Sequence, residues 1–439
     1  MKQSKFIILM ALLTALLLSG CMLQTVEDMY CLPKRSEDHD NLQSAIDAAM
    51  SDLQYAAPLA GENRQSLQMT DLDGDGVKEY LVFARSDSDE PLRILIFRQT
   101  GDEFTLMTTL SSQGMAFDRV EYVDINGDGG QELVVGCRVS DQVLGHAAVY
   151  SLADGEAEQL LSATYGQFLT CDLNSDQQSE LMILTPGEAD AQRGVALLYS
   201  WGNGRIERSA EVELSGAMEH IKRIMVSKLH GGRPAVYVAS SADGNAIITD
   251  VFAMKSGVFT NISFSNESGT SVRTLRNYYV YADDVDDDGI LELPSLITMA
   301  STHSQGREDQ YLIRWFAMDL KGREVDKLYS FHNFAGGWYV CLNNEWATQL
   351  SVEQSNDTYR FFVWDSDQQK NIPVFTIFAL TGQNRDTDAV EDGRFVLYRT
   401  DRVVYAGLLE ADAAEYGITQ NNLINDFRLI QKDWNTGET

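Results

Sequence analysis

Cysteine and basic residues are scarce in this chain of 439 residues. The sequence holds 5 cysteines, and 34 lysines and arginines stand against 65 aspartates and glutamates, for a formal net charge of −31. So few cysteines do not form a disulfide framework in a chain of this length. A surface this acidic excludes roles that need a basic face, such as nucleic-acid binding or purely electrostatic adhesion to anionic lipid. The excess of acid favours bound cations instead.

The cysteines after position 21 are expected to be structural rather than cross-linked. Cys137 and Cys171 lie in apolar runs, where a thiol behaves as a small core side chain. A single disulfide among Cys31, Cys137, Cys171 and Cys341 stays open as an alternative.

Catalytic signatures are also missing. The six histidines form no HExxH motif or other paired metal spacing, and there is no GxSxG elbow, CxxC pair or phosphate-cradling glycine loop. Carboxylates are so numerous that pairs of them have no diagnostic value. We therefore expect that the protein is not an enzyme. A hydrolase or lyase, whose two carboxylates would meet only in the fold, is the alternative.

The one long apolar run, from Phe6 to Leu18, follows Lys2 and Lys5. It is too short to span a bilayer, which takes about 20 residues. A charged start, a short apolar stretch and small residues at its end are typical of a cleaved signal peptide. The end, Leu18-Ser19-Gly20-Cys21, resembles the lipobox of bacterial lipoproteins, which implies lipidation of Cys21. We expect a protein anchored by lipid to the outside of the cell membrane, or to an outer membrane in a double-membrane organism.

Three regions follow from these observations. Residues 1–20 are expected to form the signal peptide, 21–64 a lipidated polar tether with one helix, and 65–439 the main domain. The helix is predicted over Asn41–Leu53, where apolar residues recur at helical spacing and Asp40 or Asn41 can cap the start. Past Gly61 the sequence consists of short β runs separated by Asp, Asn and Gly.

Four nine-residue segments share one acidic pattern, and an apolar strand precedes and follows each of them. They begin at Asp71, Asp124, Asp172 and Asp284. Side-chain oxygens at positions 1, 3 and 5, a backbone carbonyl at 7 and a carboxylate at 9 can surround Ca²⁺, which takes 6 to 8 oxygens. The predicted ligands are Asp71, Asp73, Asp75, Val77 and Glu79; Asp124, Asn126, Asp128, Gly130 and Glu132; Asp172, Asn174, Asp176, Gln178 and Glu180; and Asp284, Asp286, Asp288, Ile290 and Glu292.

The pattern is not an EF-hand, because that loop needs a glutamate at position 12 and a flanking helix. With strands on both sides, the segments resemble the FG-GAP and VCBS repeats, over about residues 65 to 300. The resemblance implies a β-propeller with calcium loops between the strands of its blades. The third segment is the weakest, since Gln177 replaces the glycine at position 6. Solvated Asp-rich turns without ions are the alternative.

The spacing of the segments predicts the number of blades. Their leading aspartates stand 53 and 48 residues apart, and the fourth follows 112 residues later. Half of that gap falls on Ser227–Val238, a turn and strand without acidic ligands, and similar intervals reach Leu342–Trp346 and Asp392–Tyr398. We expect an all-β propeller of seven blades, or six as the alternative, that closes into a ring with a last strand near Phe427–Ile430.

A propeller presents loops and aromatic side chains at its rims. Candidates for a rim that binds a ligand are Tyr278, Tyr279, Tyr281 and the stretch Phe331–Tyr339, although packing between blades is the preferred explanation for alternate aromatic residues. Trp346 and Trp364 are expected in the core. The predicted function is a calcium-stiffened, surface-anchored recognition module for a glycan, cell-wall or protein ligand, with an extracellular hydrolase or lyase as the alternative.

Overall fold

The computed structural model describes residues 37–140, 144–153, 155–187, 193–242, 246–278, 280–299 and 311–430. The predicted signal peptide, Cys21 and Cys31 lie outside these ranges. None of the described helices is long and apolar enough to cross a membrane.

The described residues form six antiparallel sheets, which we call blades 1 to 6. Blade 1 contains β1 (Gln54–Tyr55), β2 (Leu67–Thr70), β3 (Glu79–Arg85), β4 (Leu92–Thr100) and β5 (Glu103–Ser112). Blade 2 contains β6 (Ala116–Val123), β7 (Glu132–Arg138), β8 (Gly145–Ala153) and β9 (Glu156–Tyr165). Blade 3 contains β10 (Gln167–Cys171), β11 (Glu180–Pro186), β12 (Gly194–Gly202) and β13 (Arg205–Glu213).

The other three blades follow in chain order. Blade 4 contains β14 (Ile221–Lys228), β15 (Pro234–Ala242), β16 (Ala246–Lys255) and β17 (Val258–Asn261). Blade 5 contains β18 (Leu293–Thr298), β19 (Tyr311–Met318), β20 (Glu324–Asn333), β21 (Trp338–Leu342) and β27 (Phe427–Leu429). Blade 6 contains β22 (Leu350–Ser355), β23 (Thr358–Asp365), β24 (Lys370–Leu380), β25 (Phe395–Arg399) and β26 (Val404–Leu409).

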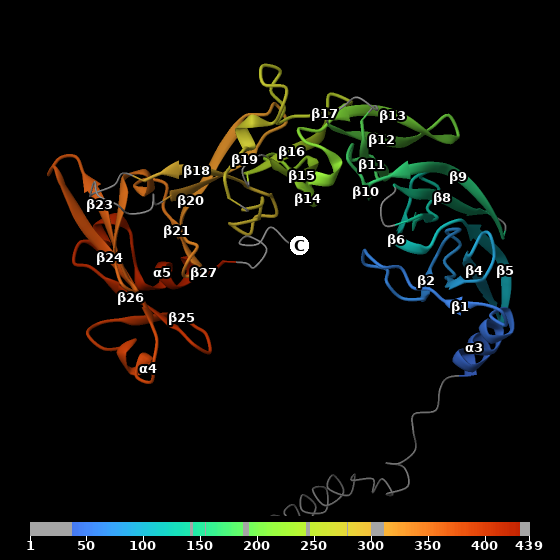
Figure 1. The fold of residues 1–439 in the computed structure, drawn as a ribbon, viewed down its shortest axis with the longest axis horizontal. Helices are drawn as coiled ribbons and strands as arrows, with labels where there is room; N and C mark the ends of the chain where they lie inside the picture. Colours follow the sequence, from blue (N-terminus) through green and yellow to red (C-terminus); the bar gives the residue numbers. More distant parts are fainter. Residues whose placement is uncertain are drawn as a thin grey trace, which may run out of the picture.

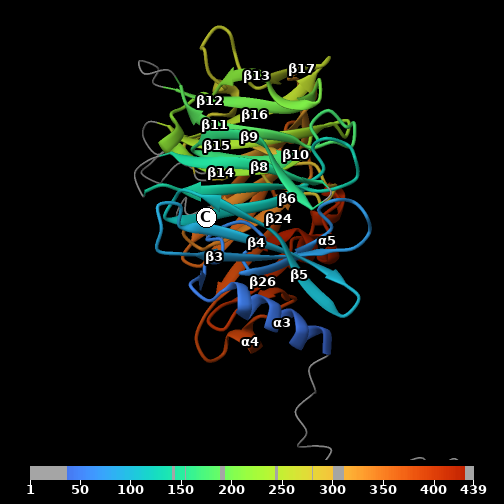
Figure 2. The same ribbon diagram turned by 90° about the vertical axis from the view of Figure 1, so that its right-hand side faces the viewer.

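The blades follow one another along an arc (Figure 1). Strands β2, β6, β10 and β14 lie on its inner side and β5, β9, β13 and β17 on its outer side, and Figure 2 shows the sheets side-on, one above another. Each pair of successive blades shares an apolar core, such as Phe83 with Phe117 between blades 1 and 2. Because the middle strands are covered on both faces, they are almost continuously apolar, as in Leu81–Ala84 of β3. The all-β propeller architecture is therefore confirmed.

The predicted seventh blade and the closed ring are not found in the described part of the chain. The segment that begins at Asp392 leads into β25, which pairs with β26 at the edge of blade 6 instead of starting a new sheet. The turn at Leu342–Trp346 joins blade 5 to blade 6 instead of two strands of one blade. Strand β27, expected to close the ring, pairs with β21 of blade 5. The six blades correspond to the alternative count, and no sheet pairs blade 6 with blade 1.

The amphipathic helix is present, but it starts earlier than predicted. Helix α3 spans Glu37–Ala49, so neither Asp40 nor Asn41 caps it. Its buried residues Leu42 and Ile46 pack on Val82 and Phe97 of blade 1. Further helical segments are α4 (Arg385–Asp388), α5 (Gln420–Asp426), η1 (Met218–His220), η3 (Val272–Thr274), η4 (Ala347–Gln349) and η5 (Ala413–Tyr416).

Candidate functional site

The four acidic segments form equivalent turns, which we call loops 1 to 4 (residues 71–79, 124–132, 172–180 and 284–292). Loops 1, 2 and 3 join the innermost strand of a blade to its second strand. Loop 4 precedes β18 in the same way, but its inner strand is reduced to an isolated bridge between Asp283 and Glu292. No helix flanks these turns, so the EF-hand is excluded by structure as well as by spacing.

The backbone of each loop is held by its own carboxylates. The aspartate at position 1 accepts two backbone N–H bonds, as Asp71 does from Gly74 at 2.9 Å and Gly76 at 3.0 Å. The aspartate at position 5 accepts one from position 7, as Asp75 does from Val77 at 2.7 Å. The same bonds recur at Asp124, Asp128, Asp172, Asp176 and Asp288. Asp284 also accepts two backbone N–H bonds, but from positions 5 and 6, Asp288 at 2.9 Å and Gly289 at 2.8 Å. Each residue at position 7 thus donates its backbone N–H to the aspartate at position 5, and its carbonyl oxygen stays a predicted ligand. These residues are Val77, Gly130, Gln178 and Ile290.

Two residues in every loop, at positions 4 and 6, adopt left-handed backbone conformations. Loops 1 and 2 place glycine at both positions, where it costs nothing. Loop 3 has Ser175 at φ 66° and Gln177 at φ 74°, and loop 4 has Asp287 at φ 60°. A non-glycine residue there costs about 1 to 2 kcal/mol. Loop 3, the weakest match in sequence, therefore adopts the same turn, but with a strained backbone at Ser175 and Gln177.

The glutamate at position 9 is the buried member of each loop. Glu79, Glu132, Glu180 and Glu292 are all no more than 4% exposed. Each accepts the backbone N–H of position 2, at 2.9, 2.8, 2.8 and 3.2 Å from Leu72, Ile125, Leu173 and Val285 in turn. A buried carboxylate is costly unless hydrogen bonds or opposite charge surround it. The second oxygen of each glutamate therefore needs a partner at the centre of its loop.

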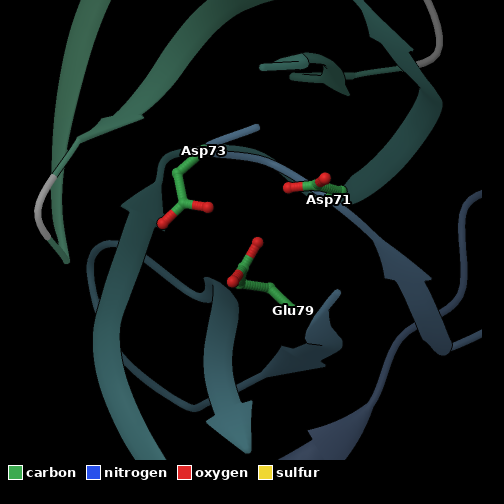
Figure 3. Close-up of side chains that lie close together, drawn as sticks. All are labelled: Asp71, Asp73 and Glu79. Carbon is green, nitrogen blue, oxygen red and sulfur yellow. The ribbon is translucent and has the colours of Figure 1, made fainter. Parts of the chain in front are cut away.

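The acidic side chains of loops 1 and 4 come together as a metal site requires. One carboxylate oxygen from each of Asp71, Asp73 and Glu79 lies within 4.8 Å of the others, and their carboxyl groups point toward a common space (Figure 3). Asp284, Asp286 and Glu292 form a second such group. These acidic clusters could hold a metal ion.

In all four loops, however, a nitrogen atom occupies the centre. In loop 1 the Arg98 guanidinium pairs with the carboxylates at positions 3, 5 and 9. In loop 4 the Lys327 ammonium pairs with the carboxylates at the same three positions. In loop 2 the Asn126 amide donates to Asp128 at 2.9 Å and to Glu132 at 2.8 Å. In loop 3 the Asn174 amide donates to Asp176 at 2.8 Å and to Glu180 at 2.7 Å.

Loop 4 is the least satisfied of the four. One oxygen of Glu292, Oε1, is buried without a hydrogen bond, and Lys327 Nζ lies 3.8 Å from it. Burial raises the pKa of Glu292 to about 8, and the neighbouring Asp286 charge adds to the rise. Burial likewise raises the pKa of Glu180 to about 7. Both carboxyls thus hold protons more tightly in the folded protein than in the unfolded chain.

We predict that replacing Glu292 by Gln stabilises the metal-free protein at high pH. Because the folded-state pKa is raised, ionisation of Glu292 lowers stability as the pH rises from about 4.5 to about 8. In urea denaturation with a chelator, Glu292→Gln should gain over the unchanged protein toward pH 8 and lose that gain toward pH 5. The exposed Glu345→Gln is the control and should show no such trend. A Glu292→Gln difference that does not vary with pH would refute the assignment.

A separate concave site, which we call the central pocket, lies on the inner side of the arc. It has a volume of about 780 Å³ and is lined by the inner strands β6, β10 and β14 together with residues 61–63. Five charged side chains line it: Arg119, Lys222, Arg223, Glu62 and Glu121. Nothing in the sequence indicated this pocket, because its strands come from three blades and carry no shared motif.

Two of these charged groups are fixed in place. Glu121 accepts hydrogen bonds from the Thr170 backbone N–H at 3.1 Å and hydroxyl at 2.5 Å, and Arg119 lies 3.6 Å from it. Burial raises the pKa of Glu121. Arg223 lies over the Tyr281 ring at 5.4 Å, a cation–π contact. Lys222 is exposed.

The aromatic residues proposed for a rim are mainly packing residues. Tyr281 and Trp338 are fully buried, and Tyr278 stacks on Phe334 at 4.8 Å. Trp346 is buried as predicted, whereas Trp364 is 42% exposed because it lies on the outward face of β23. The thiols of Cys137, Cys171 and Cys341 are free.

Comparison with known proteins agrees with the repeat pattern. Residues 61–135, which contain loops 1 and 2, match the FG-GAP-like repeat family. This confirms the resemblance that the acidic loops suggested. No curated protein matches the chain.

Several solved structures resemble this chain at low similarity. Rhamnogalacturonan lyase YesW is 12% identical with a TM-score of 0.30, over 72% of this chain and 83% of that one. The rhamnogalacturonan lyase of Bacillus licheniformis is 13% identical with a TM-score of 0.30, over 73% and 72%. A protein from Lactobacillus plantarum is 11% identical with a TM-score of 0.27, over 72% and 85%. These two lyases contradict the expectation that the chain is not an enzyme, and that expectation is withdrawn. At this level of similarity, neither their reaction nor their substrate is assigned to this chain.

Proposed function

We propose that this protein is a lipid-anchored propeller that binds an anionic ligand in the central pocket, and that this ligand is a cell-wall glycan carrying carboxylates. The supporting observation is the charge of the pocket. Three bases and two acids line it, in a chain whose acids outnumber its bases 65 to 34. Arginine binds carboxylates through paired hydrogen bonds, which makes Arg119 and Arg223 suitable for a uronate-type sugar.

The second part of the proposal concerns calcium in loops 2, 3 and 4. The nitrogen at the centre of these loops belongs to a group that can turn away. A half-turn of the Asn126 and Asn174 amides presents oxygen to the centre, at the loss of the bonds that these oxygens accept from the backbone N–H groups of Asp128 and Asp176. Lys327 carries its ammonium on a flexible stem. An ion between the carboxylates at positions 5 and 9 would neutralise the buried glutamate and strengthen the turn.

The third part is the anchor at Cys21. A Cys21→Ala variant expressed in a bacterium should leave the membrane fraction, because the diacylglycerol that would hold the chain there has no thiolate to join. Fractionation followed by immunoblotting measures this. The variant would refute the anchor if it sedimented with membranes as the unchanged protein does.

We predict that reversing the charge of Lys222 weakens binding to an acidic polysaccharide. Calorimetric titration with polygalacturonate should give an affinity about tenfold lower for Lys222→Glu, a change of about 1.4 kcal/mol. Lys228→Glu is a matched control, since Lys228 is exposed on the same strand but does not line the pocket. Neutral dextran tests whether charge matters. Equal losses in the two variants, or equal binding of dextran, would contradict the proposal.

A further inference from the structure

Arg98 is placed to act as the cation of loop 1. It lies on β4, and because Tyr80 of β3 pairs with Phe97, Arg98 stands opposite Glu79 at position 9 of the loop. Its Nε and Nη2 donate to Glu79 Oε1 at 3.1 and 2.9 Å. Nη2 also pairs with Asp73 and lies 3.5 Å from Asp75 Oδ2. One guanidinium thus contacts the three carboxylates at positions 3, 5 and 9.

Blades 2, 3 and 5, which carry the other three loops, provide an internal comparison, because each has a small residue at the position that corresponds to Arg98. The strand register puts Ser151 opposite Glu132, Ser200 opposite Glu180 and Ala317 opposite Glu292. Loops 2 and 3 also carry Asn at position 3 where loop 1 has Asp73. Loop 1 therefore combines one more negative charge than loops 2 and 3 with a long basic side chain that they lack.

Arg98 is held more firmly than Lys327 in loop 4. It makes two hydrogen bonds to a fully buried oxygen of Glu79, whereas Lys327 approaches the corresponding oxygen of Glu292 only to 3.8 Å. A guanidinium is planar and always charged, so it binds carboxylates in a fixed geometry that a lysine does not match. A divalent ion in loop 1 would have to displace this group and would then lie beside its positive charge.

We propose that Arg98 replaces the metal ion in loop 1. Blade 1 then keeps its structure without calcium, whereas loops 2, 3 and 4 bind the ion. The residues of loop 1 therefore do not fit the ion that its acidic pattern implies. Blade 1 also carries helix α3, which packs on β3 and β4. The part of the propeller nearest the N-terminal segment would then keep its fold in surroundings poor in calcium.

The test is to give loop 1 the residue that blades 2 and 3 have. The full chain, stripped of metal, is titrated with CaCl2 by calorimetry. We expect Arg98→Ser to bind one more calcium ion per chain than the unchanged protein, and its melting temperature to fall in chelator and to recover with calcium. Arg93→Ser makes the same chemical change on the same strand away from loop 1, and it should leave the number of ions unchanged. An equal ion count in Arg98→Ser and the unchanged protein would overturn the proposal.

A second variant decides the question if Arg98→Ser does not fold. Asp75→Asn removes the position-5 carboxylate of loop 1 while Arg98 is present, and it should not alter the number of bound ions. Loss of one ion in Asp75→Asn would show that loop 1 holds calcium and would overturn the proposal. Asp128→Asn in loop 2 tests the proposed calcium site of that loop separately. An unchanged ion count in Asp128→Asn would argue against calcium in loop 2 and would leave the proposal for Arg98 in loop 1 unaffected.

Discussion

The four glutamates buried at position 9 impose the constraint on which this fold depends. Each carboxylate lies under its loop with less than a twentieth of its surface exposed, and each accepts the N–H of position 2. That bond fixes the start of the loop relative to the strand that follows it. Burying a charge this deeply is tolerable only if the remaining oxygen also has a partner. The loops differ mainly in how they provide that partner.

Three kinds of partner occur in one chain: a guanidinium in loop 1, an amide in loops 2 and 3, and an ammonium in loop 4. The loops also contact one another, because hydrogen bonds join the loops of neighbouring blades. Gln131 N donates to Leu72 O at 3.1 Å, which links loops 1 and 2, and Ser179 N donates to Asp124 O at 2.8 Å, which links loops 2 and 3. At Gly130 a side chain would meet Leu72 O at 2.7 Å, so the two loops approach as closely as glycine allows. Loops 1, 2 and 3 therefore also hold neighbouring blades together.

Local features of the fold could be read from the sequence, because they depend on residues close together in the chain. The nine-residue acidic pattern predicted the loops, their flanking strands and the propeller architecture. The pairing of loop 1 with Arg98 could not be predicted, since it depends on the register between β3 and β4 across 19 residues. A seventh blade is not found in the described residues for a related reason: Asp392 begins a turn of the expected composition, but the strand that follows it, β25, pairs with β26 of blade 6. The central pocket depends on three inner strands that meet only in space.

A crystal structure of the protein grown with calcium, with anomalous scattering used to locate the ions, tests the central claim most directly. The account predicts calcium at the centres of loops 2, 3 and 4 and the Arg98 guanidinium at the centre of loop 1. Calcium in loop 1 with Arg98 turned outward, or a loop 4 in which Glu292 Oε1 contacts no calcium ion, would contradict it.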